Sequence, residues 1–195
     1  MKTVIVRPER CVGCLHCRLA CAVEHSQSRN LAGAIQELVR PQARLRIYPG
    51  RQNFAFPNKC RHCDPAPCQQ VCIAGAISRD VVRGAIDISA ARCINCGMCA
   101  MACPFGVLNF APVYQAPEKR AVAVKCDQCP DREQAGRVPA CVEACKVGAL
   151  TYGDWPTTQA DKGRALAQAV FASLQMEAQA VSAPPETIRL WRQLG

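Results

Sequence analysis

The stretch that decides the fold is Cys93-Ile94-Asn95-Cys96-Gly97-Met98-Cys99-Ala100-Met101-Ala102-Cys103-Pro104. Three thiols spaced by two residues, then a fourth after three more residues and before a proline, is the ligand spacing of cubane iron–sulfur clusters. A loop with the first three cysteines can wrap three corners of one cube. Cys103, one helical turn later, is carried past that cube and serves a second one. One such run therefore predicts another run elsewhere in the chain.

Three further runs of four cysteines are present. The first has the same spacing, the second has a four-residue middle gap that contains Pro65 and Pro67, and the last has an eleven-residue middle gap. These runs are Cys11, Cys14, Cys17 and Cys21; Cys60, Cys63, Cys68 and Cys72; and Cys126, Cys129, Cys141 and Cys145. Together with Cys93, Cys96, Cys99 and Cys103 they use all sixteen cysteines, which predicts four [4Fe–4S] clusters.

The composition favours metal over disulfides. Only ten of the 195 residues are aromatic, and a cysteine-rich chain with few large apolar residues usually replaces core burial with one of these two devices. The first ten residues lack the apolar run of a secretory signal, and no stretch reaches the roughly 18 apolar residues that span a bilayer. We therefore expect a cytoplasmic protein without a transmembrane segment, where disulfides are rare.

The formal charge of +9 does not predict nucleic-acid binding. Sixteen thiolates around four oxidised cubes would bring it to about +1, so the basic residues read as counter-charge for buried anions. Lysines and arginines are also spread from Lys2 to Arg192, whereas a nucleic-acid interface gathers them on one face.

Zinc is the main competing metal, since paired CxxC sites could also consume sixteen thiols. Zinc sites do not explain three cysteines within seven residues at 11–17 and again at 93–99. The three histidines, His16, His25 and His62, lie in or beside cluster loops, but no thiol is missing, so we expect them to hydrogen-bond near cluster sulfurs or to face solvent. Neither a catalytic triad nor a phosphate loop is evident, and the chain is not expected to be catalytic alone.

An internal repeat surrounds the motifs. Short apolar segments at 3–6, 85–88 and 121–124 precede three motifs, and a glycine with two apolar residues follows three of them, at 75–77, 106–108 and 148–150. Each unit reads as strand, cluster loop, helical turn, glycine turn and strand. Between the first two motifs, the sequence predicts a short helix at 31–39 and a half-exposed strand at 43–48. Arg44 and Arg46 would lie on the solvent-facing side of this strand, which is either a docking edge or a plain solvated edge.

The tail after Trp155-Pro156 predicts a helix that ends at Pro184-Pro185. One face of this helix carries Leu166, Ala169, Val170, Ser173 and Leu174, and a second short turn carries Ile188, Trp191 and Leu194. Packing on the protein's own core, docking to a partner and self-association through this tail stay open.

The order and spacing of the motifs over residues 1–152 resemble the four-cluster ferredoxin-like electron-transfer subunits of oxidoreductase complexes. Cys21-Ala-Val-Glu-His-Ser and Cys60-Arg-His-Cys63 look most like the ferredoxin subunit that accompanies nickel carbon monoxide dehydrogenase, and similar subunits accompany tungsten aldehyde oxidoreductases. The resemblance implies that the chain relays single electrons between a catalytic molybdenum, tungsten or nickel enzyme and another redox partner. A flavin or hydrogenase subunit is a further candidate partner, and a free soluble polyferredoxin is the alternative.

The resemblance implies an α+β fold of two bacterial-type two-cluster ferredoxin modules related by a pseudo-twofold axis, plus a C-terminal helical tail. The outer module would comprise 1–30 and 120–153, the inner module 54–112, the insert 31–53 and the tail 154–195. With the fourth ligand exchanged inside each module, the four implied ligand sets are Cys11, Cys14, Cys17 and Cys145; Cys126, Cys129, Cys141 and Cys21; Cys60, Cys63, Cys68 and Cys103; and Cys93, Cys96, Cys99 and Cys72.

Overall fold

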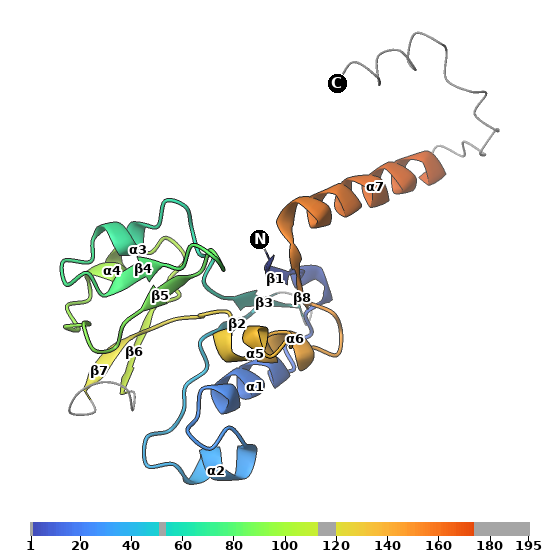
Figure 1. Cartoon of the computed structure of the whole chain (residues 1–195). Helices are drawn as coiled ribbons and strands as arrows, with labels where there is room; N and C mark the ends of the chain where they lie inside the picture. The colour runs from blue at the N-terminus through green and yellow to red at the C-terminus, as the bar shows by residue number, and fades with distance from the viewer. Residues whose placement is uncertain (1, 51–53, 113–119, 174–195) are drawn as a thin grey trace. The chain divides into compact units, whose positions relative to one another are not determined.

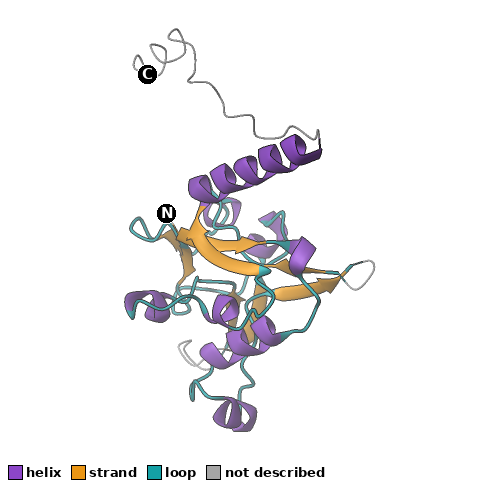
Figure 2. Cartoon of the chain, turned by 90° about the vertical axis from the view of Figure 1, so that its right-hand side faces the viewer, coloured by secondary structure: helices purple, strands orange, loops and turns teal. Residues whose placement is uncertain are grey.

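The computed structural model describes residues 2–50, 54–112 and 120–173. The chain divides into two units, Met1–Trp155 and Pro156–Gly195. The first unit mixes short helices with four two-stranded antiparallel sheets in its described part, which confirms the α+β class (Figures 1 and 2). Its elements are β1 (Lys2–Val6), η1 (Pro8–Arg10), α1 (His16–Glu24), α2 (Leu31–Gln36), β2 (Arg46–Pro49), β3 (Ala55–Asn58), α3 (Pro67–Gln70), β4 (Ile77–Arg79), β5 (Ile86–Ile88), α4 (Met98–Ala102), β6 (Asn109–Pro112), β7 (Ala121–Val124), α5 (Pro130–Gln134), α6 (Ala140–Glu143) and β8 (Leu150–Asp154).

The first and last strands of this unit form one sheet. β1 pairs with β8 in a register that sets Lys2 opposite Asp154 and Val6 opposite Leu150. Val4 of β1 and Leu150 of β8 are buried, and the helices α1 and α6 pack on each other. The pairing carries the start of the first cysteine motif to the end of the fourth, although more than a hundred residues separate them.

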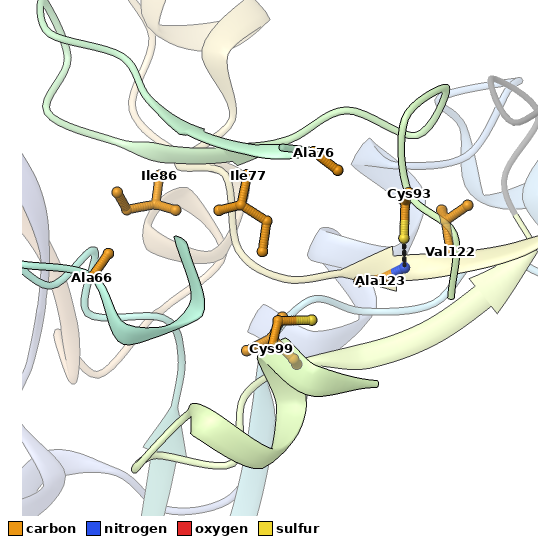
Figure 3. Packing of buried hydrophobic residues seen from close by; sticks show 9 residues of the cluster. Ala66, Ala76, Ile77, Ile86, Cys93, Cys99, Val122 and Ala123 are labelled. Atoms are coloured by element: carbon orange, nitrogen blue, oxygen red, sulfur yellow. Dashed lines mark hydrogen bonds between the residues drawn. The ribbon is translucent and has the colours of Figure 1, made fainter. Parts of the chain in front are cut away.

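The middle of the chain forms two more sheets, β4 with β5 and β6 with β7, and α3 packs on α4 (Figure 1). Ile77, Ile86 and Val122 are buried in one core with Cys93 and Cys99 (Figure 3). β7 precedes the fourth motif in sequence but packs in this core beside the second and third motifs. The chain therefore runs from a strand of this core directly into the fourth motif.

The glycine turns of the repeat occur where the sequence predicts them. Gly75, Gly106 and Gly148 have φ of 57°, 58° and 65°, and β4, β6 and β8 follow them. A left-handed φ strains any residue with a Cβ, so glycine is favoured at each turn. The apolar segments at 3–6, 85–88 and 121–124 correspond to β1, β5 and β7, although β1 starts one residue earlier and β5 one residue later than the segment.

The segment between the first two motifs departs from expectation. α2 ends at Gln36 rather than residue 39, because Glu37 is extended with φ −65° and ψ 135°. The strand predicted at 43–48 starts only at Arg46, where β2 pairs with β3. Placing Arg44 on a wet strand face is wrong, since Arg44 lies before the strand, half-buried, in an ion pair with Asp127. Arg46 is exposed as predicted.

The second unit contributes most of α7 (Trp155–Ser173), which includes Leu166, Ala169 and Val170 of the predicted apolar face. Leu174, the Pro184-Pro185 stop and the turn with Ile188, Trp191 and Leu194 lie outside the described residues. In the part of the chain that the structure describes, α7 and the other helices are too short or too polar to cross a membrane.

Candidate metal centres

Three small cavities are each lined by four thiols drawn from two motifs. The first is lined by Cys11, Cys14, Cys17 and Cys145, the second by Cys21, Cys126, Cys129 and Cys141, and the third by Cys72, Cys93, Cys96 and Cys99. These groups coincide with three of the four ligand sets implied by the resemblance. All sixteen cysteines, each in a described segment, are free thiols.

The fourth group gathers around Cys68. Burial raises the pKa of Cys68, the Lys125 ammonium lowers it, and the thiols of Cys60 and Cys103 raise it further. Cys68 and Cys103 belong to different motifs and pack against the same core, because α3, which carries Cys68, packs on α4, which Cys103 follows. Cys63 follows Cys60 in the same loop and is half-buried.

Burial raises the pKa of two of these thiols, Cys17 and Cys129, and so favours their protonated forms. It raises the pKa of Cys17 to about 11 and that of Cys129 to about 12, and nearby thiols such as Cys145 and Cys126 add to the two shifts. Iron binds the thiolate, so loading a site releases protons and supplies the missing counter-charge. Thiols crowded at this spacing are therefore unfavourable as anions on their own and favourable as ligands of a cationic cluster.

The backbone of each motif is shaped to surround a sulfur-rich group. The third residue of every motif is left-handed, with φ of 69° at Gly13, 52° at His62, 60° at Asn95 and 67° at Gln128. This turn aims backbone N–H groups inward, as in anion-binding nests. Several backbone N–H groups donate to cysteine sulfurs: Arg44 to Cys21 (3.2 Å), His62 to Cys60 (3.4 Å), Ala76 to Cys72 (3.3 Å), Ala123 to Cys93 (3.4 Å, dashed in Figure 3) and Leu150 to Cys145 (3.3 Å).

Two buried side chains carry polar atoms without partners in the described part of the chain. His62 is 5 % exposed and Gln128 1 %. The backbone N–H of Ile86 donates to His62 Nδ1 at 2.9 Å, which leaves the proton of the neutral ring on Nε2, and Nε2 is unpaired. Both polar atoms of the Gln128 side chain are unpaired as well. Buried N–H groups are costly to leave unsatisfied, and cluster sulfides beside Cys60 and Cys126 would accept from them. The residues present therefore fit [4Fe–4S] clusters.

A polar network borders the Cys21 group. His25 Nδ1 lies 2.7 Å from Cys21 O and 3.7 Å from Cys21 Sγ, and its Nε2 lies 3.2 Å from Asp127 Oδ1. Burial alone would raise the pKa of Asp127, but the hydrogen bond from His25 and the charge of Arg44 hold it well below its usual range. His25 thus lies near a cluster thiol as predicted, and His16 is exposed.

Sequence reasoning missed several polar residues of the site, namely the buried Lys59, Lys125 and Gln128 and the half-buried Asp127. Lys59 and Lys125 each precede the first cysteine of a motif, and Asp127 and Gln128 lie between two cysteines. Aligning the four motifs position by position would have singled out the two lysines, since a basic residue precedes the first cysteine in every motif, but it gives no signal for Asp127 or Gln128.

Comparison with known proteins agrees with this geometry. Residues 52–155 match the 4Fe-4S dicluster domain family. The chain is 36 % identical over 160 residues to electron transport protein HydN of Escherichia coli K12, covering 77 % of this chain and 87 % of HydN. It is 38 % identical over 157 residues to an iron-sulfur protein of Rhodospirillum rubrum, covering 77 % of this chain and 81 % of that protein.

A third relative, protein NrfC of Escherichia coli K12, is 36 % identical over 145 residues, which cover 74 % of this chain and 61 % of NrfC. The chain belongs to the 4Fe-4S ferredoxin-like electron-transfer family. It is an iron–sulfur protein of the electron-carrier type.

Proposed function

We propose that this chain relays single electrons through four [4Fe–4S] clusters held by its sixteen cysteines in the four exchanged ligand sets. The observation that carries the proposal is the convergence of thiols from distant motifs. Cys145 lines the same cavity as Cys11. Cys21 lines the same cavity as Cys126, and Cys72 lines the same cavity as Cys93. In this proposal an outer and an inner ferredoxin module are joined through β7.

The clusters would follow one another in a line. Cys99 of one set and Cys68 of the next lie close enough to interact electrostatically, and so do Cys126 and Cys60. Cys21 follows Cys17 by one turn of α1, which links the last two sets. The supported order is the Cys96 set, the Cys63 set, the Cys129 set and the Cys14 set.

The two ends of this line are the sets with a thiol at the surface. Cys14 and Cys96 are the exposed cysteines among the sixteen, and each belongs to an end set. Exposed apolar side chains surround both: Val12, Leu15 and Val147 line the cavity of Cys14, and Ile94 and Met98 that of Cys96. Apolar rims around an exposed cluster suit transient docking of a redox partner, because they desolvate on contact.

We further propose that one of these ends serves a catalytic oxidoreductase subunit and the other a second redox protein. The sequence resemblance favours a tungsten or molybdenum aldehyde oxidoreductase or a nickel carbon monoxide dehydrogenase as the catalytic partner. Its identity and a cytoplasmic location stay predictions.

The exchanged ligand sets are tested with Cys145→Ser and Cys21→Ser in the full chain, purified without oxygen. We expect Cys145→Ser to alter the electron paramagnetic resonance signal that Cys11→Ser alters, and Cys21→Ser the signal that Cys126→Ser alters. If Cys145→Ser instead alters the signal that Cys126→Ser alters, the exchange is wrong.

A further inference from the structure

Each motif has a basic residue directly before its first cysteine, but the four differ in burial. Arg10 and Arg92, before the first and third motifs, are exposed. Lys59 and Lys125, before the second and fourth motifs, are only 4 % and 3 % exposed. Buried lysines thus occur at the two motifs that supply the central clusters of the proposed line, and exposed arginines at the two end motifs.

Both buried ammonium groups donate to oxygen atoms of uncharged groups. Lys59 Nζ donates to Cys60 O at 3.0 Å and to Thr3 Oγ1 at 3.5 Å. Lys125 Nζ donates to Ile86 O and, at 3.1 Å, to Cys126 O. Among the described residues, no aspartate or glutamate forms an ion pair with either lysine. A buried cation is costly unless a negative group lies nearby, so these lysines require an anionic neighbour.

The thiols around the two lysines come from both central sets. Burial lowers the pKa of Lys59, whereas the thiols of Cys126 and Cys60 raise it. Lys59 directly precedes Cys60 of the second motif and also lines the cavity of the Cys126 set, so it borders both central sets. Lys125 acts on Cys68 of the second motif, although it precedes the fourth. Each lysine thus reaches thiols of the motif that it does not precede.

We infer that Lys59 and Lys125 are built-in counter-charges for the two central clusters and raise the reduction potentials of both. The inference rests on the proposed four-cluster relay. Each added electron makes a cluster and its four thiolates more negative, so a nearby cation stabilises the reduced form more than the oxidised form. Water screens this effect at Arg10 and Arg92 but much less at a buried ammonium.

The test uses the full chain with its clusters, purified without oxygen, in Lys59→Gln and Lys125→Gln variants. Glutamine keeps an N–H donor for the carbonyl partners and removes the charge. In a redox titration followed by electron paramagnetic resonance, two of the four reduction steps should move to lower potential. At a fixed potential the ratio of reduced to oxidised cluster in those steps should fall at least about tenfold, which is about 59 mV for one electron.

Matched controls come from the same repeat position. Arg10→Gln and Arg92→Gln should change that ratio less than about twofold, because both side chains are exposed. Lys59→Arg and Lys125→Arg keep the charge, so both reduction steps should stay close to their wild-type potentials.

The outcomes separate this inference from the relay itself. Normal iron content with unchanged potentials in both glutamine variants overturns the inference and leaves the relay intact, whereas a wild-type protein without about four clusters overturns the relay. The glutamine variants could fail to hold iron while the arginine variants hold it. That result would support the inference, because the clusters would then need a positive charge at these positions. If the arginine variants fail as well, the lysines act through packing and the inference is wrong.

Discussion

Arg132 ties the eleven-residue insertion of the fourth motif to its surroundings, and its removal should selectively weaken the clusters of that half. The side chain is 8 % exposed. Its Nη1 donates to Glu24 Oε2 at 3.0 Å, its Nε donates to Val138 O at 2.8 Å, and its Nη2 pairs with Glu143. These contacts join α5 to α1 and α6, the helices that carry Cys21 and Cys141.

The magnitude for Arg132→Met follows from the exposure of the groups left behind. Glu24 is 17 % exposed and would lose a charged hydrogen bond, at a cost of about 2 kcal/mol. The Val138 carbonyl would lose a donor, at about 1 kcal/mol. Glu143 is 54 % exposed, is hydrated after the change and adds little. The two costs add to about 3 kcal/mol. If the network is broken in the transition state for cluster loss, the rate of cluster loss should rise about a hundredfold.

The assay is the rate at which visible cluster absorbance disappears in guanidinium chloride without oxygen. Arg137→Met is the matched control, since Arg137 is 57 % exposed and reaches the same Glu143 at 3.5 Å. We expect about hundredfold faster loss of part of the absorbance in Arg132→Met, and less than about threefold in Arg137→Met. Equal rates in the two variants would refute the account of this network.

Three further predictions follow from single contacts. Burial, and then the hydrogen bond that Tyr152 donates to Glu133 (2.8 Å), raise the pKa of Tyr152. This bond therefore stabilises the folded protein at pH values below the ordinary tyrosine pKa of about 10, and the stabilisation is lost as the pH rises further. Tyr152→Phe should therefore cost about 1 kcal/mol at pH 8 in denaturant unfolding, and a difference that does not shrink above pH 10 contradicts this. Gly106→Ala should lower the free energy of unfolding by about 1 kcal/mol. The cost comes from the φ of 58° alone, since a Cβ there meets no atom within 4 Å. An unchanged unfolding midpoint would show that no strain arises. Leu15→Glu should slow electron exchange with the partner that docks at Cys14 about tenfold while leaving the potentials unchanged, and stopped-flow rates equal to wild type would exclude docking there.

The parts of the fold that depend on local spacing were predictable from the sequence. The cysteine runs, the glycine turns at Gly75, Gly106 and Gly148, and the strands beside them follow from repeated short patterns. The repeat also predicts left-handed turns after three motifs, because glycine occurs where a Cβ would be strained.

Features that depend on long-range contacts were not predictable in the same way. Arg44 reads as a strand residue by alternation, but Asp127, 83 positions later, holds it in an ion pair before the strand begins. Lysine is normally a surface residue, so the burial of Lys59 and Lys125 is visible only once the second and fourth motifs meet. β7 pairs with β6, its neighbour in sequence, but the packing of Val122 with Ile77 and Ile86 is a long-range contact that sequence order does not reveal.

The most direct test is the iron, acid-labile sulfide and zinc content of the full chain purified without oxygen. Four [4Fe–4S] clusters predict about sixteen iron and about sixteen sulfide per chain, negligible zinc, and a brown protein. About eight iron per chain would leave two of the thiol-lined cavities without a cluster and contradict the four-cluster relay. Zinc with little iron or sulfide in a colourless protein would contradict the iron–sulfur assignment itself.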